Sequence, residues 1–178
     1  MTSNAKKMSG TRAMVFCAMC VALMAVCAQI AVPLPIPFTM QTFAVFTAIC
    51  LLDMKWAVFS IICYITMGGL GLPVFAGFKG GAQAVFGPTG GYMIGFVFAA
   101  LLSGMLYRRT NRFSGRLLSL CAGLAVCYLF GTVWFMAVYS NDISLWSALM
   151  TCVIPFVVPD IIKAVLAILI SDKLRSFL

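Results

Sequence analysis

Long apolar runs separated by short polar or glycine- and proline-rich gaps dominate this chain. A helix needs about 20 mostly apolar residues to cross a bilayer, and two runs are about 15 residues long. A charged turn between those two runs would be costly at the membrane centre, so we interpret them as a helical hairpin. The pattern predicts an all-α integral membrane protein with six transmembrane helices, forming one domain over residues 1–178. The expected spans are Ala13–Val32, Phe38–Leu52, Trp56–Leu70, Tyr92–Tyr107, Leu117–Val138 and at least Phe156–Ile170.

Two of the gaps lack the composition of a helix. The first run ends at Pro33–Pro37, whose prolines forbid a continued helix. The stretch Gly68–Gly91, between the third and fourth spans, is apolar yet too rich in glycine and proline for regular helix. Irregular backbone near a membrane must be buried in protein or line a cavity. We therefore expect Gly68–Gly91 to be an irregular binding loop.

Basic residues are concentrated in every second gap between the apolar runs. This distribution indicates on which side of the membrane each gap lies. Cytoplasmic loops of membrane proteins carry an excess of Lys and Arg. Six crossings that start in the cytoplasm place both termini and ten of the twelve basic residues inside. The proline turn, the glycine-rich loop with Lys79, and Ser140–Ser144 then face outward, and the predicted location is the cytoplasmic membrane. The inner residues are Lys6, Lys7, Arg12, Lys55, Arg108, Arg109, Arg112, Arg116, Lys173 and Arg175.

Composition excludes several other classes of protein. Hydrophobic residues make up 63% and charged residues 9% of the chain, against about 25% charged in soluble domains. The net charge of +8 does not indicate nucleic-acid binding, because the basic residues are not gathered on a soluble surface. The eight cysteines lie within apolar runs and the chain has no histidine, so we predict neither a metal site nor a cofactor. We interpret the cysteines as small apolar packing residues.

Asp160 and Lys163 are embedded in the last apolar run. Each ionised group in a bilayer costs roughly 2.5–3.5 kcal/mol, and such residues usually mark function. Their i,i+3 spacing places both on one helix face, and the adjacent Pro159 suits a first helical turn. The alternative is a structural ion pair that joins two helices.

The predicted outer loops supply further polar and aromatic groups for a small-molecule pocket. An interfacial aromatic belt is the alternative explanation for Trp134. Gly91 and Gly95 form a GxxxG pair that indicates close helix packing. The candidate ligand-binding residues besides Asp160 and Lys163 are Thr39, Gln41, Lys79, Gln83, Gly87, Thr89, Gly91, Tyr92, Thr132 and Trp134.

Several of these segments, in this order, resemble the biotin-specific substrate-capture (S) component of energy-coupling factor (ECF) transporters. The resemblance covers nearly the whole chain. It rests on Ile36–Phe43, Gly71–Gly77, Gly87–Tyr92, Gly131–Trp134, and Pro159–Asp160 followed by Lys163.

The resemblance implies six helices, an outward pocket, and three kinds of partner: biotin, a transmembrane coupling subunit and two cytoplasmic ATPase subunits. It implies that Asp160 and Lys163 contact the ligand. It also implies that a small-residue face on the first helix, here Ala18 and Ala22, meets the coupling subunit. The Phe78–Lys79 pair departs from the family's more glycine-rich pattern, so the role of Lys79 rests on its charge: we expect Lys79 and the glycine-rich loop to bind the tail carboxylate of biotin.

The chemistry of biotin fits these residues. A carboxylate accepts from the ureido N–H groups and an ammonium donates to the ureido carbonyl. We therefore predict a biotin uptake subunit energised by separate ATPases. An S component for another small vitamin remains open, as does an ion or proton channel. An enzyme is disfavoured because the chain has four acidic residues, none of them glutamate, and no histidine.

Overall fold

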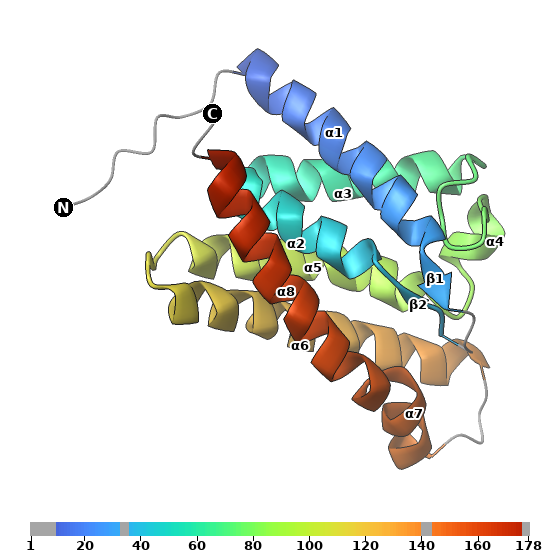
Figure 1. Cartoon of the computed structure of the whole chain (residues 1–178). Helices are drawn as coiled ribbons and strands as arrows, with labels where there is room; N and C mark the ends of the chain where they lie inside the picture. Colours follow the sequence, from blue (N-terminus) through green and yellow to red (C-terminus); the bar gives the residue numbers. More distant parts are fainter. Residues whose placement is uncertain (1–9, 33–35, 140–143, 176–178) are drawn as a thin grey trace.

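The structure is a computed structural model that describes residues 10–32, 36–139 and 144–175. Helices follow one another along most of the chain, and one short antiparallel pair of strands joins the first two (Figure 1). The strands are β1 (Ala31–Val32) and β2 (Phe38–Thr39). The helices are α1 (Gly10–Gln29), α2 (Gln41–Leu51), α3 (Met54–Gly69), α4 (Ala82–Val85), α5 (Gly90–Tyr107), α6 (Phe113–Tyr139), α7 (Leu145–Cys152) and α8 (Ile154–Arg175).

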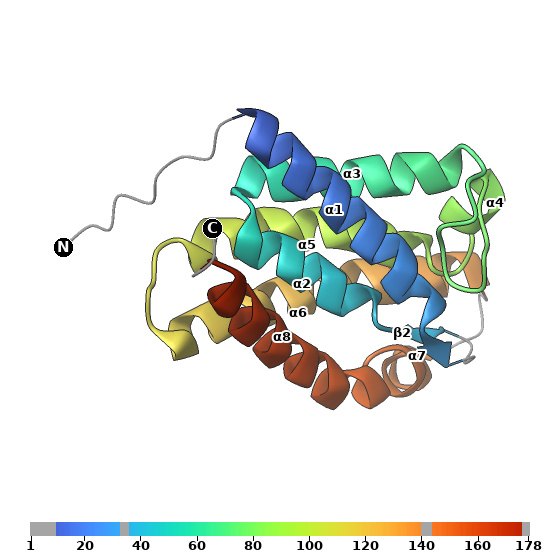
Figure 2. The same cartoon turned by 45° about the horizontal axis from the view of Figure 1, so that its top comes forward.

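The long helices run back and forth between two ends of the molecule. Figures 1 and 2 show the start of α1, the α2–α3 and α5–α6 turns and the end of α8 at one end, which we call the basic end. The strands, α4 and α7 lie at the opposite end, which we call the loop end. Every segment predicted to bind a ligand, apart from parts of α6 and α8, therefore lies towards one end.

Ion pairs, and hydrogen bonds from arginine side chains to backbone carbonyls, connect the helices at the basic end. Arg108 pairs with Asp53 and also donates to the Leu52 carbonyl, at 3.1 Å. Arg116 pairs with Asp172 at 2.6 Å between Nη1 and Oδ1, and Arg175 donates to the Cys50 carbonyl. Basic residues at the α5–α6 turn and at the end of α8 thus gather at one end, as the alternating charge pattern predicted. Lys6 and Lys7 lie outside the described residues.

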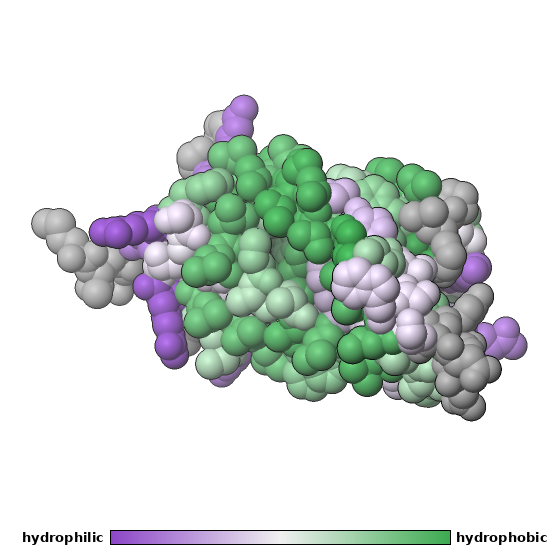
Figure 3. Space-filling model, turned by 90° about the horizontal axis from the view of Figure 1, so that it is seen from below, coloured by the Kyte–Doolittle hydropathy of each residue, from purple (hydrophilic) through white to green (hydrophobic). Residues whose placement is uncertain are grey.

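Four stretches of the described residues are long and apolar enough to cross a membrane: Gly10–Gln29, Gly90–Tyr107, Phe113–Val138 and Leu145–Arg175. Helices α2 and α3 are apolar but shorter. Figure 3 shows one face on which apolar residues cover the middle and hydrophilic residues lie towards the two ends. The chain is a multi-pass membrane protein, and the count of six spans stays a prediction.

Close contact between α5 and α6 forms one side of the bundle. Gly91 and Gly95 both face α6, where a Cβ on Gly91 would meet Trp134 and one on Gly95 would meet the backbone of Cys127. The GxxxG pair therefore lets the two backbones approach each other, which is the packing role predicted for it. The core also buries cysteines on α1, α2 and α6, among them Cys20, Cys50 and Cys127.

The observed elements differ from the predicted spans in four respects. Phe38–Thr39 and Ala31–Val32 form strands, so α1 ends earlier than expected, at Gln29, and α2 is shorter than expected. The glycine-rich stretch contains the one-turn helix α4 in its glycine-free part, and α7 precedes the last span. Pro159 was wrongly assigned to a first turn: it lies inside α8, which begins at Ile154. Residues 33–35 of the proline turn and 140–143 of the Ser140–Ser144 loop lie outside the described residues.

Candidate ligand-binding cavity

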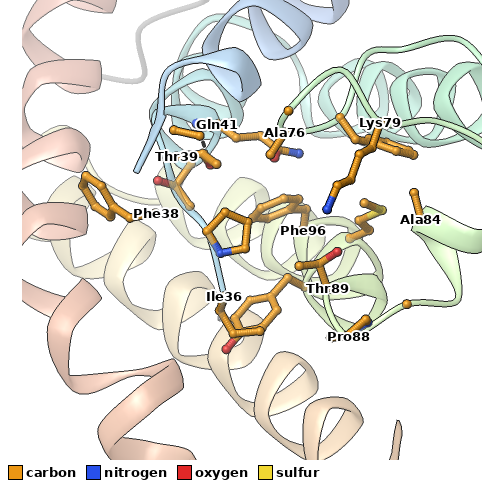
Figure 4. A pocket seen from close by; sticks show the side chains of 18 of the residues that line it. Ile36, Phe38, Thr39, Gln41, Ala76, Lys79, Ala84, Pro88, Thr89 and Phe96 are labelled. Atoms are coloured by element: carbon orange, nitrogen blue, oxygen red, sulfur yellow. Dashed lines mark hydrogen bonds between the residues drawn. The ribbon is translucent and has the colours of Figure 1, made fainter. Parts of the chain in front are cut away.

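A cavity of about 870 Å³ opens at the loop end. Its walls come from Gln29 at the end of α1, from β1, β2 and the start of α2, from α5, α6 and α8, and from two parts of the glycine-rich stretch, residues 75–80 and 83–89. Figure 4 shows labelled side chains from β2, the start of α2, the glycine-rich stretch and α5 around one space. The volume lies within the range of about 300–1,000 Å³ typical of small-molecule sites.

The most polar wall of this cavity is a buried ion pair on α8. Lys163 Nζ lies 2.7 Å from Asp160 Oδ1, and both side chains are only 4% exposed. Thr42 Oγ1 donates to Asp160 Oδ1 at 2.8 Å, and Tyr128 Oη donates to Oδ2 at 2.7 Å. Helices α2 and α6 therefore supply donors that stabilise the carboxylate away from water.

The ammonium group of Lys163 also has a hydrogen-bond partner for each of its donors. It donates to Thr39 O at 2.7 Å and Thr42 Oγ1 at 3.1 Å, besides Asp160. These three bonds use all three ammonium donors, whereas Asp160 accepts three bonds out of about four lone-pair sites. The ammonium also lies 3.9 Å from the centroid of the Phe38 ring, which stacks on Phe156 at 5.9 Å. The pair is thus held rigidly, with one acceptor site left on Asp160.

Gln41 contributes a polar group without a partner. Its side chain lines the cavity, and the residue is 8% exposed. Among the described residues its Nε2 makes no hydrogen bond. Buried polar groups are nearly always hydrogen-bonded, so this amide nitrogen is suited to donate to an acceptor on a bound molecule.

The glycine-rich stretch covers the cavity. Phe75 and Lys79 pair as a single antiparallel bridge, with Phe75 N to Lys79 O at 3.0 Å, and Ala76, Gly77 and Lys79 line the space beneath. In Figure 4 the Lys79 side chain extends from this loop into the cavity, on the side where Phe96 and Thr89 lie. A cation therefore faces the space from the opposite side to β2.

The structure brings most of the predicted site residues to this cavity. Those that line it are Asp160, Lys163, Thr39, Gln41, Lys79, Gln83, Gly87, Thr89 and Tyr92.

Gly91, Thr132 and Trp134 are not among its lining residues. Gly91 is buried against Trp134, whose Nε1 donates to Gly87 O at 3.0 Å, and Thr132 is 5% exposed. These three residues support the cavity wall from behind, because the close α5–α6 packing directs them away from the space.

Sequence reasoning missed Tyr128 and Phe156, and it did not assign Phe38 to the site. Tyr128 contacts Asp160 across 32 positions of the chain. Its sequence surroundings are uniformly apolar, so they gave no indication that this hydroxyl points inward. Phe38 precedes the predicted residues Thr39 and Gln41 and could have been found by extending that motif.

Ala18 and Ala22, predicted to meet a partner, lie elsewhere. Both are exposed on α1 and line an apolar groove of about 390 Å³ between α1 and α3. Phe59, Met67 and Cys63 form part of the α3 side. The groove shares none of its lining with the wall that holds Asp160 and Lys163.

A bundle of membrane-spanning helices around a cavity with a buried ion pair defines a membrane-embedded small-molecule-binding protein. Comparison with known proteins gives the particular family: the BioY family model matches residues 1–178, and the chain belongs to this family.

Its relatives cover nearly its full length. The biotin transporter BioY of Thermotoga maritima is 42% identical over 156 residues, which are 87% of this chain and 90% of the relative. The probable biotin transporter BioY of Pyrococcus horikoshii is 41% identical, covering 89% of this chain and 93% of the relative. A crystal structure of the S-component for biotin from an ECF-type ABC transporter superposes with a TM-score of 0.84. It is 27% identical, and the match covers 99% of this chain and 95% of that one.

Proposed function

We propose that this chain binds biotin in the cavity at its loop end and serves as the substrate-capture subunit of a biotin uptake system. The observation that carries the proposal is the buried Asp160–Lys163 pair in the wall of a ligand-sized cavity. The names of its BioY relatives support biotin as the substrate. The chain is a transporter subunit and not an enzyme.

The ureido ring of biotin would lie against the ion pair. One ring N–H would donate to the remaining acceptor site on Asp160, and the ring carbonyl would accept from the unpartnered Gln41 Nε2. Lys163 can reach that carbonyl only if its bond to Thr39 O gives way, because its three donors are engaged. We therefore assign Lys163 the role of pairing with Asp160 and positioning its carboxylate, with a ligand contact formed by exchange.

The rest of biotin matches the remaining walls. Its thiophane ring and alkyl chain would pack against apolar side chains that line the cavity, such as Phe38, Phe96 and Met93. The tail carboxylate would pair with Lys79, on the same side of the cavity as Thr89. Gln83 also lines the cavity. Charge-assisted bonds of this kind are roughly twice as strong as neutral ones.

The basic end is proposed to face the cytoplasm, so that the cavity opens outward across the cytoplasmic membrane. The gathering of Arg108, Arg116 and Arg175 at one end supports this orientation. Both chain termini would then be cytoplasmic.

The energy for transport is proposed to come from separate subunits. The chain contains no GxxxxGK[ST] phosphate-binding motif. A transmembrane coupling subunit would dock on the groove around Ala18 and Ala22, and two ATPase subunits would bind to that subunit in the cytoplasm. The exposure of both alanines in an apolar groove supports this assignment.

The test is calorimetric titration of biotin into the purified protein in lipid nanodiscs, with thiamine and riboflavin as matched vitamins. Saturable binding of biotin alone supports the proposal. Binding of another vitamin in preference to biotin, or of none of the three, contradicts it. Ion flux through ligand-free proteoliposomes would instead favour a channel.

A further inference from the structure

Residues 75–81 of the glycine-rich stretch form the roof of the cavity, and the base of this roof is fixed by different contacts from its tip. At its base, the Phe75 ring is buried and contacts Tyr64 edge-on at 5.5 Å between centroids, and Tyr64 Oη donates to Val74 O at 3.0 Å. Gly81 N also bonds to Gly68 O at 2.7 Å on α3. The residues between these anchors, 76–79, form the tip of the roof, and Gly77, Phe78 and Lys79 are exposed.

Besides the Phe75–Lys79 bridge, the tip is held by Gln29, at the last position of α1. Gln29 Oε1 accepts from Phe78 N at 2.9 Å, and Gln29 Nε2 donates to Phe75 O at 3.1 Å. The same nitrogen lies 3.3 Å from Ala25 O, one turn back in α1. One side chain therefore ties both the tip and its base to the end of α1.

The conformation of the tip needs such support. Phe78 has a φ of 56°, in the left-handed region that residues with a Cβ rarely adopt, and its side chain is 72% exposed. Strain of this kind persists only where the surrounding structure imposes it. The Gln29–Phe78 bond supplies that restraint, because the exposed Phe78 ring has little packing to supply it.

The end of α1 also holds the opposite rim of the cavity. Met40 N bonds to Ile30 O at 3.0 Å, and β1 pairs with β2, which carries Phe38 and Thr39. Figures 1 and 2 show the end of α1, the strands and the glycine-rich loop together at one corner of the molecule. The two rims of the cavity thus meet at one helix end.

We propose that Gln29 is a positioning residue that latches residues 76–79 over the cavity and so sets how long a ligand stays bound. The ligand-retention part rests on the proposed function, whereas the latch itself is a property of the empty protein. Breaking the two bonds frees the tip around Phe78, while the Phe75–Lys79 bridge and the Gly81 anchor keep the base in place.

The test compares Gln29→Met, which keeps the side-chain length but cannot bond, with Ile30→Met, a neighbouring control at a residue that is 60% exposed. In ligand-free protein we expect amide hydrogen exchange at Phe78, the amide that donates to Gln29, to rise at least tenfold in Gln29→Met only. Exchange at Phe75 and Gly81 should stay as in the parent. We also expect biotin to dissociate roughly tenfold faster with an unreduced association rate, because Gln29→Met removes two hydrogen bonds that hold the tip closed.

A purely structural role would instead raise exchange throughout α1 and lower the association rate or the binding capacity, and this outcome overturns the latch. Unchanged exchange at Phe78 in Gln29→Met overturns it as well. As a rescue, Gln29→Glu keeps an acceptor for Phe78 N and should restore most of the protection of that amide. If the parent protein fails to bind biotin, the proposed function fails, and exchange at Phe78 alone decides whether the latch exists.

Discussion

Replacing Asp160 with asparagine removes the counter-charge of Lys163 while preserving the shape of the side chain. The carboxylate accepts from Lys163, Thr42 and Tyr128 at 2.7–2.8 Å. An asparagine has one oxygen in place of two and turns an NH₂ group towards one of these donors. Because the pair is 4% exposed, water cannot replace the lost contacts. Breaking a buried ion pair in this way typically costs about 3–5 kcal/mol.

We expect two separable losses in Asp160→Asn. The free energy of unfolding should fall by about 3 kcal/mol, measured by SDS denaturation followed by tryptophan fluorescence. The Kd for biotin should rise roughly ten- to hundredfold, because a hydrogen bond to a charged group contributes about 1.5–3 kcal/mol. This Kd is measured by calorimetry in nanodiscs.

The double variant Asp160→Asn/Lys163→Gln separates stability from binding. It removes both charges, so no uncompensated ion stays buried, and we expect it to regain much of the lost stability. Biotin binding should remain weak, because the ionised acceptor is still missing. If Asp160→Asn bound biotin as tightly as the parent, the assignment of this carboxylate to the ligand would be refuted. Recovery of tight binding in the double variant would refute it equally.

Three further predictions concern other parts of the molecule. Lys79→Gln should weaken biotin binding about tenfold and leave the binding of biotin methyl ester unchanged. Titration of both ligands measures this, and equal weakening of both would contradict a contact with the tail carboxylate. Ala18→Leu should fill the α1–α3 groove and abolish co-purification with a coupling subunit without altering the Kd for biotin, whereas Val15→Leu, also on the exposed surface of α1, serves as the control. Gly91→Ala should lower the free energy of unfolding by about 1–3 kcal/mol, because its Cβ would clash with Trp134. The SDS titration measures this free energy, and an unchanged value would mean that the α5–α6 contact is looser than described.

Hydropathy alone located most of the helices. The predicted spans Tyr92–Tyr107 and Leu117–Val138 match α5 and α6 closely, because a long apolar run of the right length has few alternatives to a helix in a membrane. The helix ends were predicted less well. Phe38–Thr39 became a strand because pairing with Ala31–Val32 satisfies its backbone, and hydropathy does not report which segments will pair.

The candidate site was predictable from the sequence where charged residues stand within an apolar run. Asp160 and Lys163 stand out in an apolar run, and their i,i+3 spacing already places them together. Thr132 and Trp134 have equally suggestive chemistry, yet close packing of α5 on α6 directs them behind the cavity wall. Composition indicates which groups have a function to serve, but it does not give the direction in which a side chain points.

The sequence by itself therefore determined the membrane environment, the charge asymmetry between the two ends, and the presence of a buried acid and base on one helix. These features depend on local composition and helical period, which act over a few residues. Only the tertiary structure decided that Thr42, 118 positions from Asp160, would share its carboxylate with Tyr128, and that Gln29 would reach Phe78 across 49 positions. Those contacts arise because packed helices bring distant residues to within 3 Å, and nothing in the local pattern specifies which residues will meet.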